Sequence, residues 1–195
     1  MTVSFAEYIV SKNPALYLKL DDATPVTAID ESANSNDGSY YGGIVCQRTP
    51  LLAEGYSVLL DGSGDYIDIP HISAYNANSQ TIIGVFKAPA WAPSDAKGLS
   101  YKAPDTGYNK EFSVVIKGGG SGKILASFSN GVDTVTNLFT AGDICDGNVH
   151  MYALVKQYDA GGDTFNLYFD DSLADSVTVG YNAHQNTEKI TLARV

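Results

Sequence analysis

The chain has 195 residues, 44% of them hydrophobic and 17% charged, a composition that excludes intrinsic disorder and suits one domain with a substantial core. Its 22 acidic and 12 basic residues give a net charge of −10, which disfavours a nucleic-acid partner because a phosphate backbone would be repelled. No apolar run approaches the roughly 20 residues that span a bilayer, so no membrane insertion is expected.

The chain is expected to open with a short helix. Ser4-Phe5-Ala6-Glu7 matches a capping box, in which a Ser and a Glu three residues later satisfy each other's free helix N–H groups. Asn13-Pro14 must end the helix, because the residue before a proline is pushed out of helical geometry. No basic region followed by an apolar stretch precedes it, so no signal peptide is expected and synthesis in the cytoplasm is predicted.

Beyond Pro14 the sequence alternates with a period of two, which is typical of half-buried strands. The clearest strand is 149–156, in which Val149, Met151, Ala153 and Val155 share one face. The other expected strands are 15–20, 56–61, 65–69, 81–87, 111–117, 123–129, 132–138, 163–169 and 188–194, with 99–103 open as a further strand. Short turns rich in Gly, Asn and Asp join them, and no helices lie between. This pattern predicts an all-β, antiparallel β-sandwich as a single domain over residues 1–195, with residues 1–13 as a helical lead-in.

The two cysteines, Cys46 and Cys145, stand in unrelated local contexts. Free thiols are expected, and a disulfide is the alternative.

Acidic residues around one turn raise the question of calcium. Asp61 and Asp65 flank a Gly-Ser-Gly turn, and Asp21 and Asp22 end a segment expected nearby. Calcium prefers clustered oxygen ligands on turns, so these four carboxylates are candidate ligands for Ca²⁺. The alternative is ordinary turn chemistry, in which Asp side chains accept hydrogen bonds from backbone N–H groups.

Aromatic residues are the best indication of a binding surface. The irregular stretch 88–110 holds Trp91, Tyr101 and Tyr108, and Tyr40 and Tyr41 stand together earlier in the chain. Sugars bind by stacking their C–H faces on aromatic rings, and long irregular segments on a rigid scaffold often carry binding sites. These five side chains are therefore candidate ligand contacts, and packing against the core is the alternative.

Catalytic patterns are missing from the sequence. No Asp or Glu pair stands at i, i+2, the spacing that would place two carboxylates of one strand on the same face for glycosidic chemistry. The three histidines, His71, His150 and His184, lack zinc spacing. The segment 117–123 (KGGGSGK) lacks the glycine and the Ser or Thr positions of a phosphate loop. The chain is therefore expected not to be an enzyme.

Five segments together resemble the concanavalin A-like lectin/glucanase superfamily, and specifically the laminin-G-like jelly-roll modules of bacterial surface proteins and phage virion proteins. They are 14–22 (PALYLKLDD), 30–43 (DESANSNDGSYYGG), 57–70 (SVLLDGSGDYIDIP), 146–155 (DGNVHMYALV) and 166–174 (NLYFDDSLA). Members of this family usually continue past the strand that 188–194 resembles. Either the chain is truncated there, or the open sheet edge is covered by a neighbouring subunit.

The resemblance implies a non-catalytic recognition module. The expected function is carbohydrate binding or adhesion as part of a phage virion, in a tail fibre, spike or decoration. A structural virion or assembly protein acting through protein–protein contacts is the alternative, and a glycoside hydrolase ranks last. The expected partner is a glycan or another virion protein, in a homo-oligomer or a larger assembly. The expected location is the virion, with the cell surface or the extracellular space as alternatives.

Overall fold

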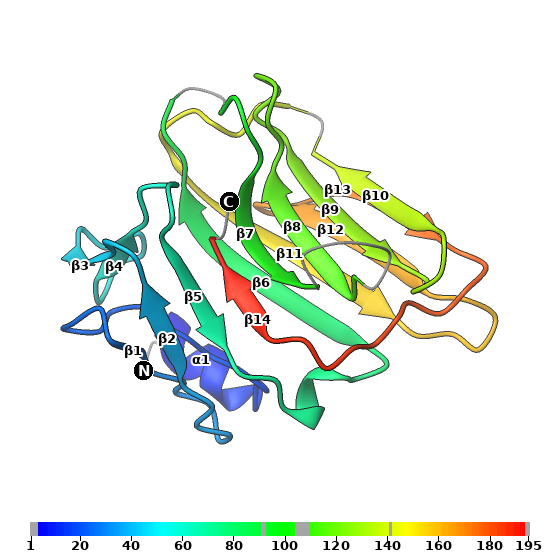
Figure 1. Ribbon diagram of the computed structural model, residues 1–195, viewed down its shortest axis with the longest axis horizontal. Coiled ribbons are helices and arrows are strands. Elements are labelled where there is room, and N and C mark those ends of the chain that lie inside the picture. Colours follow the sequence, from blue (N-terminus) through cyan, green and yellow to red (C-terminus); the bar gives the residue numbers. More distant parts are fainter. Residues whose placement is uncertain (1–3, 91–92, 104–109, 141, 194–195) are drawn as a thin grey trace.

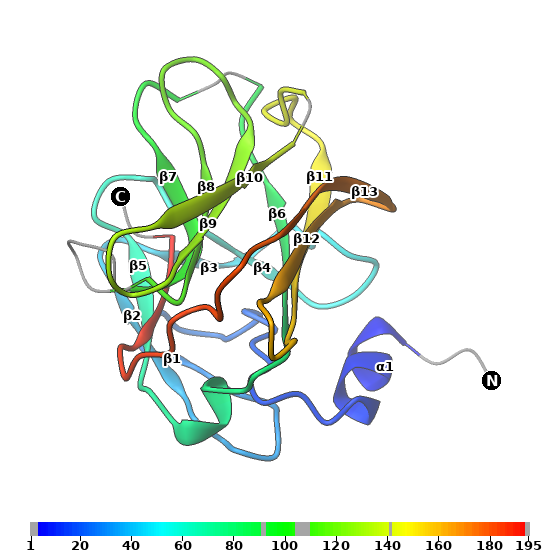
Figure 2. The same ribbon diagram turned by 90° about the vertical axis from the view of Figure 1, so that its right-hand side faces the viewer.

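A computed structural model describes residues 4–90, 93–103, 110–140 and 142–193. Two antiparallel sheets face each other across a common core, and one short helix precedes them (Figures 1 and 2). The architecture confirms the prediction of an all-β sandwich of the jelly-roll type with a helical lead-in.

The larger sheet has eight strands. In spatial order they are β1 (Thr27–Ala28), β2 (Gly38–Tyr41), β5 (Tyr66–Ile69), β14 (Ile190–Leu192), β7 (Lys97–Lys102), β8 (Phe112–Ile116), β9 (Ile124–Ser129) and β10 (Val135–Phe139). The last strand, β14, thus lies between β5 and β7 and pairs with both. It joins the early strands of the chain to the middle ones within one sheet (Figure 1).

The smaller sheet has four strands and forms the opposite layer. In spatial order they are β13 (Ser172–Thr178), β12 (Thr164–Phe169), β11 (Val149–Gln157) and β6 (Gln80–Lys87). β3 (Val45–Arg48) and β4 (Ser57–Leu59) form a separate hairpin, and a 3-10 turn, η1 (Ser73–Tyr75), precedes β6. Within the described residues β6 pairs only with β11, so its other side is a sheet edge.

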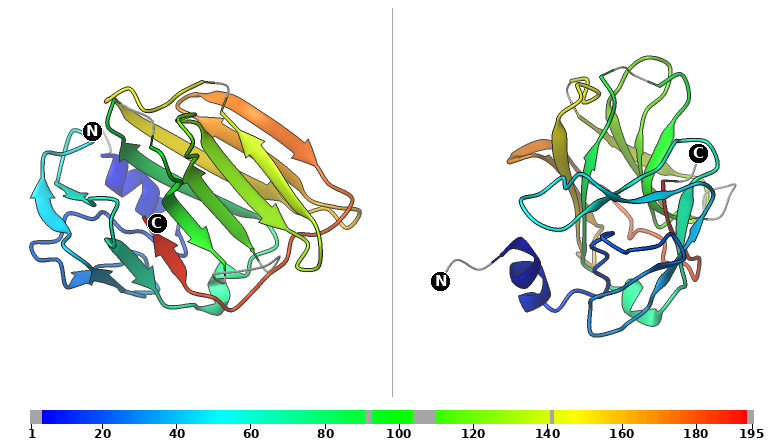
Figure 3. Two further views of the ribbon diagram at one scale, coloured as in Figure 1. Left: turned by 45° about the horizontal axis from the view of Figure 1, so that its top comes forward. Right: turned by 90° about the vertical axis from the view of Figure 1, so that its left-hand side faces the viewer.

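The helix α1 (Phe5–Ser11) begins at the predicted capping box. The Glu7 amide donates to Ser4 Oγ at 3.2 Å, and the Ser4 amide donates to Glu7 Oε2 at 2.8 Å. No residue of α1 is buried, and the helix lies on the side of the smaller sheet (Figures 2 and 3). In the described part of the chain, no helix has the length and apolar character needed to cross a membrane.

The core lies between the sheets and identifies the inward face of each strand. On β11 the buried side chains are Tyr152, Leu154 and Lys156. The outer face of this strand is the more apolar of the two, so its alternation pointed to the wrong face as the buried one. The outer face consists of the four residues that were predicted to share one apolar face: Val149, Met151, Ala153 and Val155.

Some strand predictions were wrong. Residues 15–20 form no strand and contribute a single bridge from Leu18 to Asp30, because Asp30 Oδ1 accepts the Tyr17 amide at 2.9 Å in place of a ladder partner. β2 and β3 were not predicted. β13 was also missed, because its polar residues on an exposed sheet edge resemble a turn. β7 confirms the strand left open at 99–103. Cys46 and Cys145 are free, as expected.

Candidate functional site

The aromatic residues singled out in the sequence do not form one described site. Trp91 and Tyr108 lie outside the described residues. Tyr101 alternates with the inward Ser100 and Lys102 on β7 and therefore faces outward. Tyr41 is 44% exposed, and its ring stacks on that of Tyr66 at 4.7 Å.

Tyr40 points the other way, into the core, where 7% of its surface is exposed. Its hydroxyl donates to Asp22 Oδ2 at 2.7 Å. Burial, followed by the bond to Asp22, raises the pKa of this phenol. The ring is thus occupied by packing and offers no free face to a sugar.

The four candidate calcium ligands have separate local partners. Asp65 is buried and accepts the amides of Gly43 at 2.6 Å and Asp61 at 2.9 Å. Asp61 accepts the Ser63 amide at 2.7 Å, and Asp21 pairs with Lys19 at 2.8 Å. Among the described residues, no three His, Cys, Asp or Glu side chains gather as a metal ion would require. These contacts are those of the turn interpretation, and calcium binding stays a prediction.

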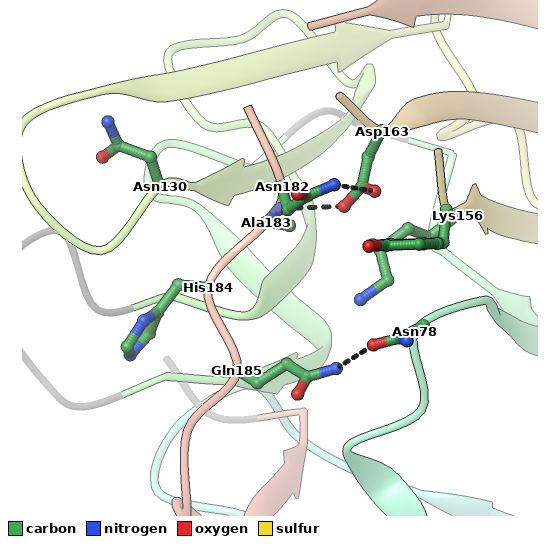
Figure 4. Close-up of a pocket in the computed structure, with 9 residues that line it drawn as sticks. Asn78, Asn130, Lys156, Asp163, Asn182, Ala183, His184 and Gln185 are labelled. Atoms are coloured by element: carbon green, nitrogen blue, oxygen red, sulfur yellow. Dashed lines mark hydrogen bonds between the residues drawn. The ribbon is translucent and has the colours of Figure 1, made fainter. Parts of the chain in front are cut away.

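A polar pocket of about 330 Å³ opens at one end of the sandwich. Nine residues from five separate segments line it: Asn78, Asn130, Lys156, Tyr158, Asp163, Asn182, Ala183, His184 and Gln185. Figure 4 shows the segment 182–185 crossing the pocket. Asp163 and Lys156 lie on one side of this segment, and Asn130 lies on the other.

The segment 182–185 is tied to the smaller sheet by a buried carboxylate. Asp163 accepts the Ala183 amide at 2.8 Å and Asn182 Nδ2 at 3.0 Å. Asn182 Nδ2 also donates to the Asp159 carbonyl at 2.8 Å. Gln185 Nε2 donates to the Asn76 carbonyl at 3.0 Å. The carboxamide nitrogens thus fix this wall of the pocket.

The same bonds leave polar atoms available to a ligand. Among the described residues, no group donates to Asn182 Oδ1 or to Gln185 Oε1, and none accepts from Asn78 Nδ2. These atoms offer two acceptors and a donor at one opening, a combination that suits hydroxyl groups, which both donate and accept.

Lys156 reaches into the pocket from the inward face of β11 (Figure 4). The residue is 6% exposed, and among the described residues no group forms a hydrogen bond or ion pair with its ammonium. Burial lowers the pKa of this ammonium, and the carboxylates of Glu111 and Asp163 oppose that shift.

A second buried lysine on the facing sheet has a full set of partners. The Lys102 ammonium pairs with Glu111 and donates to Asn76 Oδ1 and to the Asn186 carbonyl, both at 2.7 Å. Glu111 also accepts Gln80 Nε2 at 2.8 Å. Asn76 and Asn186 belong to the two segments that carry Asn78 and Gln185, so this interior network positions the pocket walls.

This pocket was not predicted from the sequence. Lys156 shares the inward face of β11 with Tyr152 and Leu154, but the alternation of this strand pointed to the other face, so the sequence carried no signal for a lysine between the sheets. The run 182–186 (NAHQN) carries no motif with a defined chemistry. It lies between β13 and β14, and its bonds to Asp163, just before β12, hold it against the smaller sheet.

His150 has the contacts of a structural histidine. Nδ1 lies 3.1 Å from Asp170 Oδ2, Nε2 lies 3.0 Å from Asp146 Oδ1, and the ring packs near Phe169. Burial opposes the charged form, but the two carboxylates outweigh it and raise the pKa of the imidazole. The histidine thus joins two turns at the end of the smaller sheet opposite the polar pocket.

Comparison with known proteins gives the fold and little more. No family model and no curated protein matches the chain. Among solved structures, the endo-β-1,4-glucuronan lyase of the fungus Trichoderma reesei matches with a TM-score of 0.51 and 9% identity over 91% of this chain and 77% of the lyase. At that identity the likeness shows a shared fold and nothing about activity.

Two further matches have TM-scores below 0.5. The CBM40 module of the Ruminococcus gnavus IT-sialidase gives 0.48 with 14% identity, over 62% of this chain and 66% of the module. The Bacillus licheniformis β-glucanase gives 0.46 with 11% identity, over 88% of this chain and 73% of the enzyme. The chain covers 62–66% of the CBM40 structures that it matches. The absence of catalysis stays a prediction.

Proposed function

We propose that this domain is a carbohydrate-recognition module whose ligand enters the polar pocket at the end of the sandwich. The observation that carries the proposal is the set of free polar atoms on Asn78, Asn182 and Gln185 around a cavity of about 330 Å³. Ligand sites are typically concave, of about 300–1,000 Å³, and place a few polar groups on a rigid frame. The two sheets and the Lys102–Glu111 pair supply that frame.

The biological setting follows from the motif resemblance to phage and bacterial surface modules. We place the domain on a phage virion, in a tail fibre, spike or decoration, where glycan binding would serve attachment to a host. The cell surface and the extracellular space are the alternatives. This part of the proposal rests on the resemblance, because likeness of fold alone does not determine function.

The test is a glycan array followed by titration calorimetry on any hit. Asn78→Ala removes a free donor at the pocket and is expected to weaken binding several-fold. The matched control is Asn148→Ala, which changes another exposed asparagine at the opposite end of β11. Binding that is unaffected by Asn78→Ala but lost in Tyr101→Ala would move the site to the outer face of the larger sheet. If the array gives no hit, carbohydrate recognition is refuted.

A second candidate function, assembly through protein–protein contacts, is favoured by a different surface. Four apolar side chains are 38–55% exposed on the outer face of the smaller sheet: Ile83, Val149, Tyr168 and Leu173. An apolar groove of about 490 Å³ continues this face toward Phe5 and Leu52. Exposed apolar patches often mark sites of protein association.

Light scattering after size exclusion tests this candidate. A homo-oligomer that dissociates in Ile83→Lys, with no hit on the glycan array, would favour assembly. A monomer at high concentration in the wild type would argue against self-association through this face.

A further inference from the structure

We propose that the pocket selects acidic saccharides, whose carboxylate accepts hydrogen bonds from the Lys156 ammonium. The inference rests on the proposed carbohydrate function and names the chemical class of its ligand.

Lys102 and Lys156 both lie between the sheets, but only Lys102 is satisfied. Its ammonium has three acceptors, from Glu111, Asn76 and Asn186. Lys156 is 6% exposed and has none among the described residues. The ammonium itself opens on the pocket, while the rest of the side chain is buried, so it is only partly hydrated. A ligand group that accepts its hydrogen bonds therefore gains more binding energy here than at a fully exposed lysine.

The nearby carboxylates are already engaged and do not take this role. Glu111 is held by Lys102, Gln80 Nε2 and the Asn186 amide at 3.2 Å. Asp163 is held by Asn182 and Ala183. They lower the cost of a positive charge on Lys156 through space but make no direct bond to it. The direct partner is therefore left to the ligand.

The rest of the pocket decides between a simple anion and a sugar acid. Asn182 Oδ1 and Gln185 Oε1 are acceptors, which would repel the oxygens of a bare phosphate or sulfate and would accept from hydroxyl groups. A ligand that satisfies Lys156 and these two atoms together carries a strong acceptor for the ammonium and hydroxyl groups for the two carboxamide oxygens. Sugar acids have both, and hydrogen bonds between charged groups are about twice as strong as neutral ones.

The experiment compares matched pairs of oligosaccharides that differ in oxidation of C6: glucuronate with glucose, galacturonate with galactose, and mannuronate with mannose, each pair sharing its linkages. Inorganic phosphate is the non-sugar anion. Affinities are measured by calorimetry at about 0.15 M salt for the wild type, Lys156→Met and Lys87→Met. Lys87 is exposed on β6, so its substitution removes the same charge outside the pocket.

In the wild type and in Lys87→Met, at least one acidic sugar is expected to bind at least tenfold more tightly than its neutral partner. In Lys156→Met, the ratio of the two affinities is expected to fall to about one. Equal binding of acidic and neutral partners in all three proteins would overturn the inference and leave carbohydrate recognition standing. Phosphate binding as tightly as the uronates would also overturn it. If no sugar binds, the proposed function itself fails.

A thermal melt without ligand provides a second, independent measurement. Because Lys156→Met removes a partly desolvated ammonium that has no hydrogen-bond partner among the described residues, and fills its space with an apolar chain of similar length, its melting temperature is expected to equal or exceed that of the wild type. A fall of several degrees would show that the ammonium has partners in the free protein. That result would overturn the inference whatever the sugars do.

Discussion

The substitution Asp65→Ala distinguishes turn chemistry from a calcium site at the turn between β4 and β5. Asp65 is 2% exposed, and its two oxygens accept the amides of Gly43 and Asp61. Gly42 adopts φ of +91°, and a Cβ there would lie 2.3 Å from Asp65 Oδ1, so the backbone is shaped around this carboxylate. Removing it leaves two partly buried amides unpaired at about 1.5 kcal/mol each, or about 3 kcal/mol in total.

The assay is thermal and urea unfolding, with and without calcium. For a chain of this length, about 3 kcal/mol corresponds to a fall in melting temperature of about 6–12 °C. The control is Asp61→Ala, whose exposed carboxylate accepts the Ser63 amide and no other group of the described residues, and whose loss is expected to cost less than about 1 kcal/mol. Calcium is expected to leave all three melting temperatures unchanged.

The opposite pattern would refute this reasoning. A bound ion at 100 times its dissociation constant stabilises the folded state by about 2.7 kcal/mol. If calcium raises the melting temperature of the wild type but not of Asp65→Ala, the carboxylate is a ligand and the turn interpretation is wrong. A free energy of unfolding in Asp65→Ala within 0.5 kcal/mol of the wild type would also contradict the count of unpaired amides.

Two further substitutions test the smaller sheet. Because Asp146 and Asp170 raise the pKa of His150 above 6.5, its contribution to stability is complete below pH 6.5 and is lost as the pH rises through the raised value. Urea unfolding between pH 5.5 and 8.5 is expected to show this loss in the wild type and not in His150→Gln; identical pH profiles would contradict it. Gly84→Ala places a Cβ 2.4 Å from the Tyr152 ring, so a loss of about 1–3 kcal/mol by urea unfolding is expected, and an unchanged value would show that the ring moves freely.

Much of the fold could be predicted because its signals are local. The capping box at Ser4 and Glu7 needs only neighbours in sequence, and it formed as expected. Strands with one apolar face, such as β5 and β8, alternate clearly. Where the pairing partner decides the structure, local pattern failed: 15–20 has the apolar content of a strand, but its amide at Tyr17 bonds the Asp30 side chain. β13 is polar because it lies at a sheet edge.

The candidate site was harder to predict because it depends on contacts between distant segments. Asn78 and Lys156 are 78 residues apart in the sequence, and Lys156 and Gln185 are 29 residues apart. Only the packing of the two sheets brings these three residues together at one pocket. The aromatic residues drew attention because their chemistry is visible one residue at a time. An amide becomes informative only when its bonded and free atoms are known.

The interior pair Lys102–Glu111 explains how a pocket built from loops can be precise. Lys102 bonds Asn76 and Asn186, which lie two residues before Asn78 and one residue after Gln185. One ion pair on the larger sheet thus fixes both segments facing Lys156 on the smaller sheet. A buried pair of this kind contributes little net stability, because desolvation offsets its attraction. Its value here is positional: the free atoms of the pocket are held before a ligand arrives, so binding need not order them.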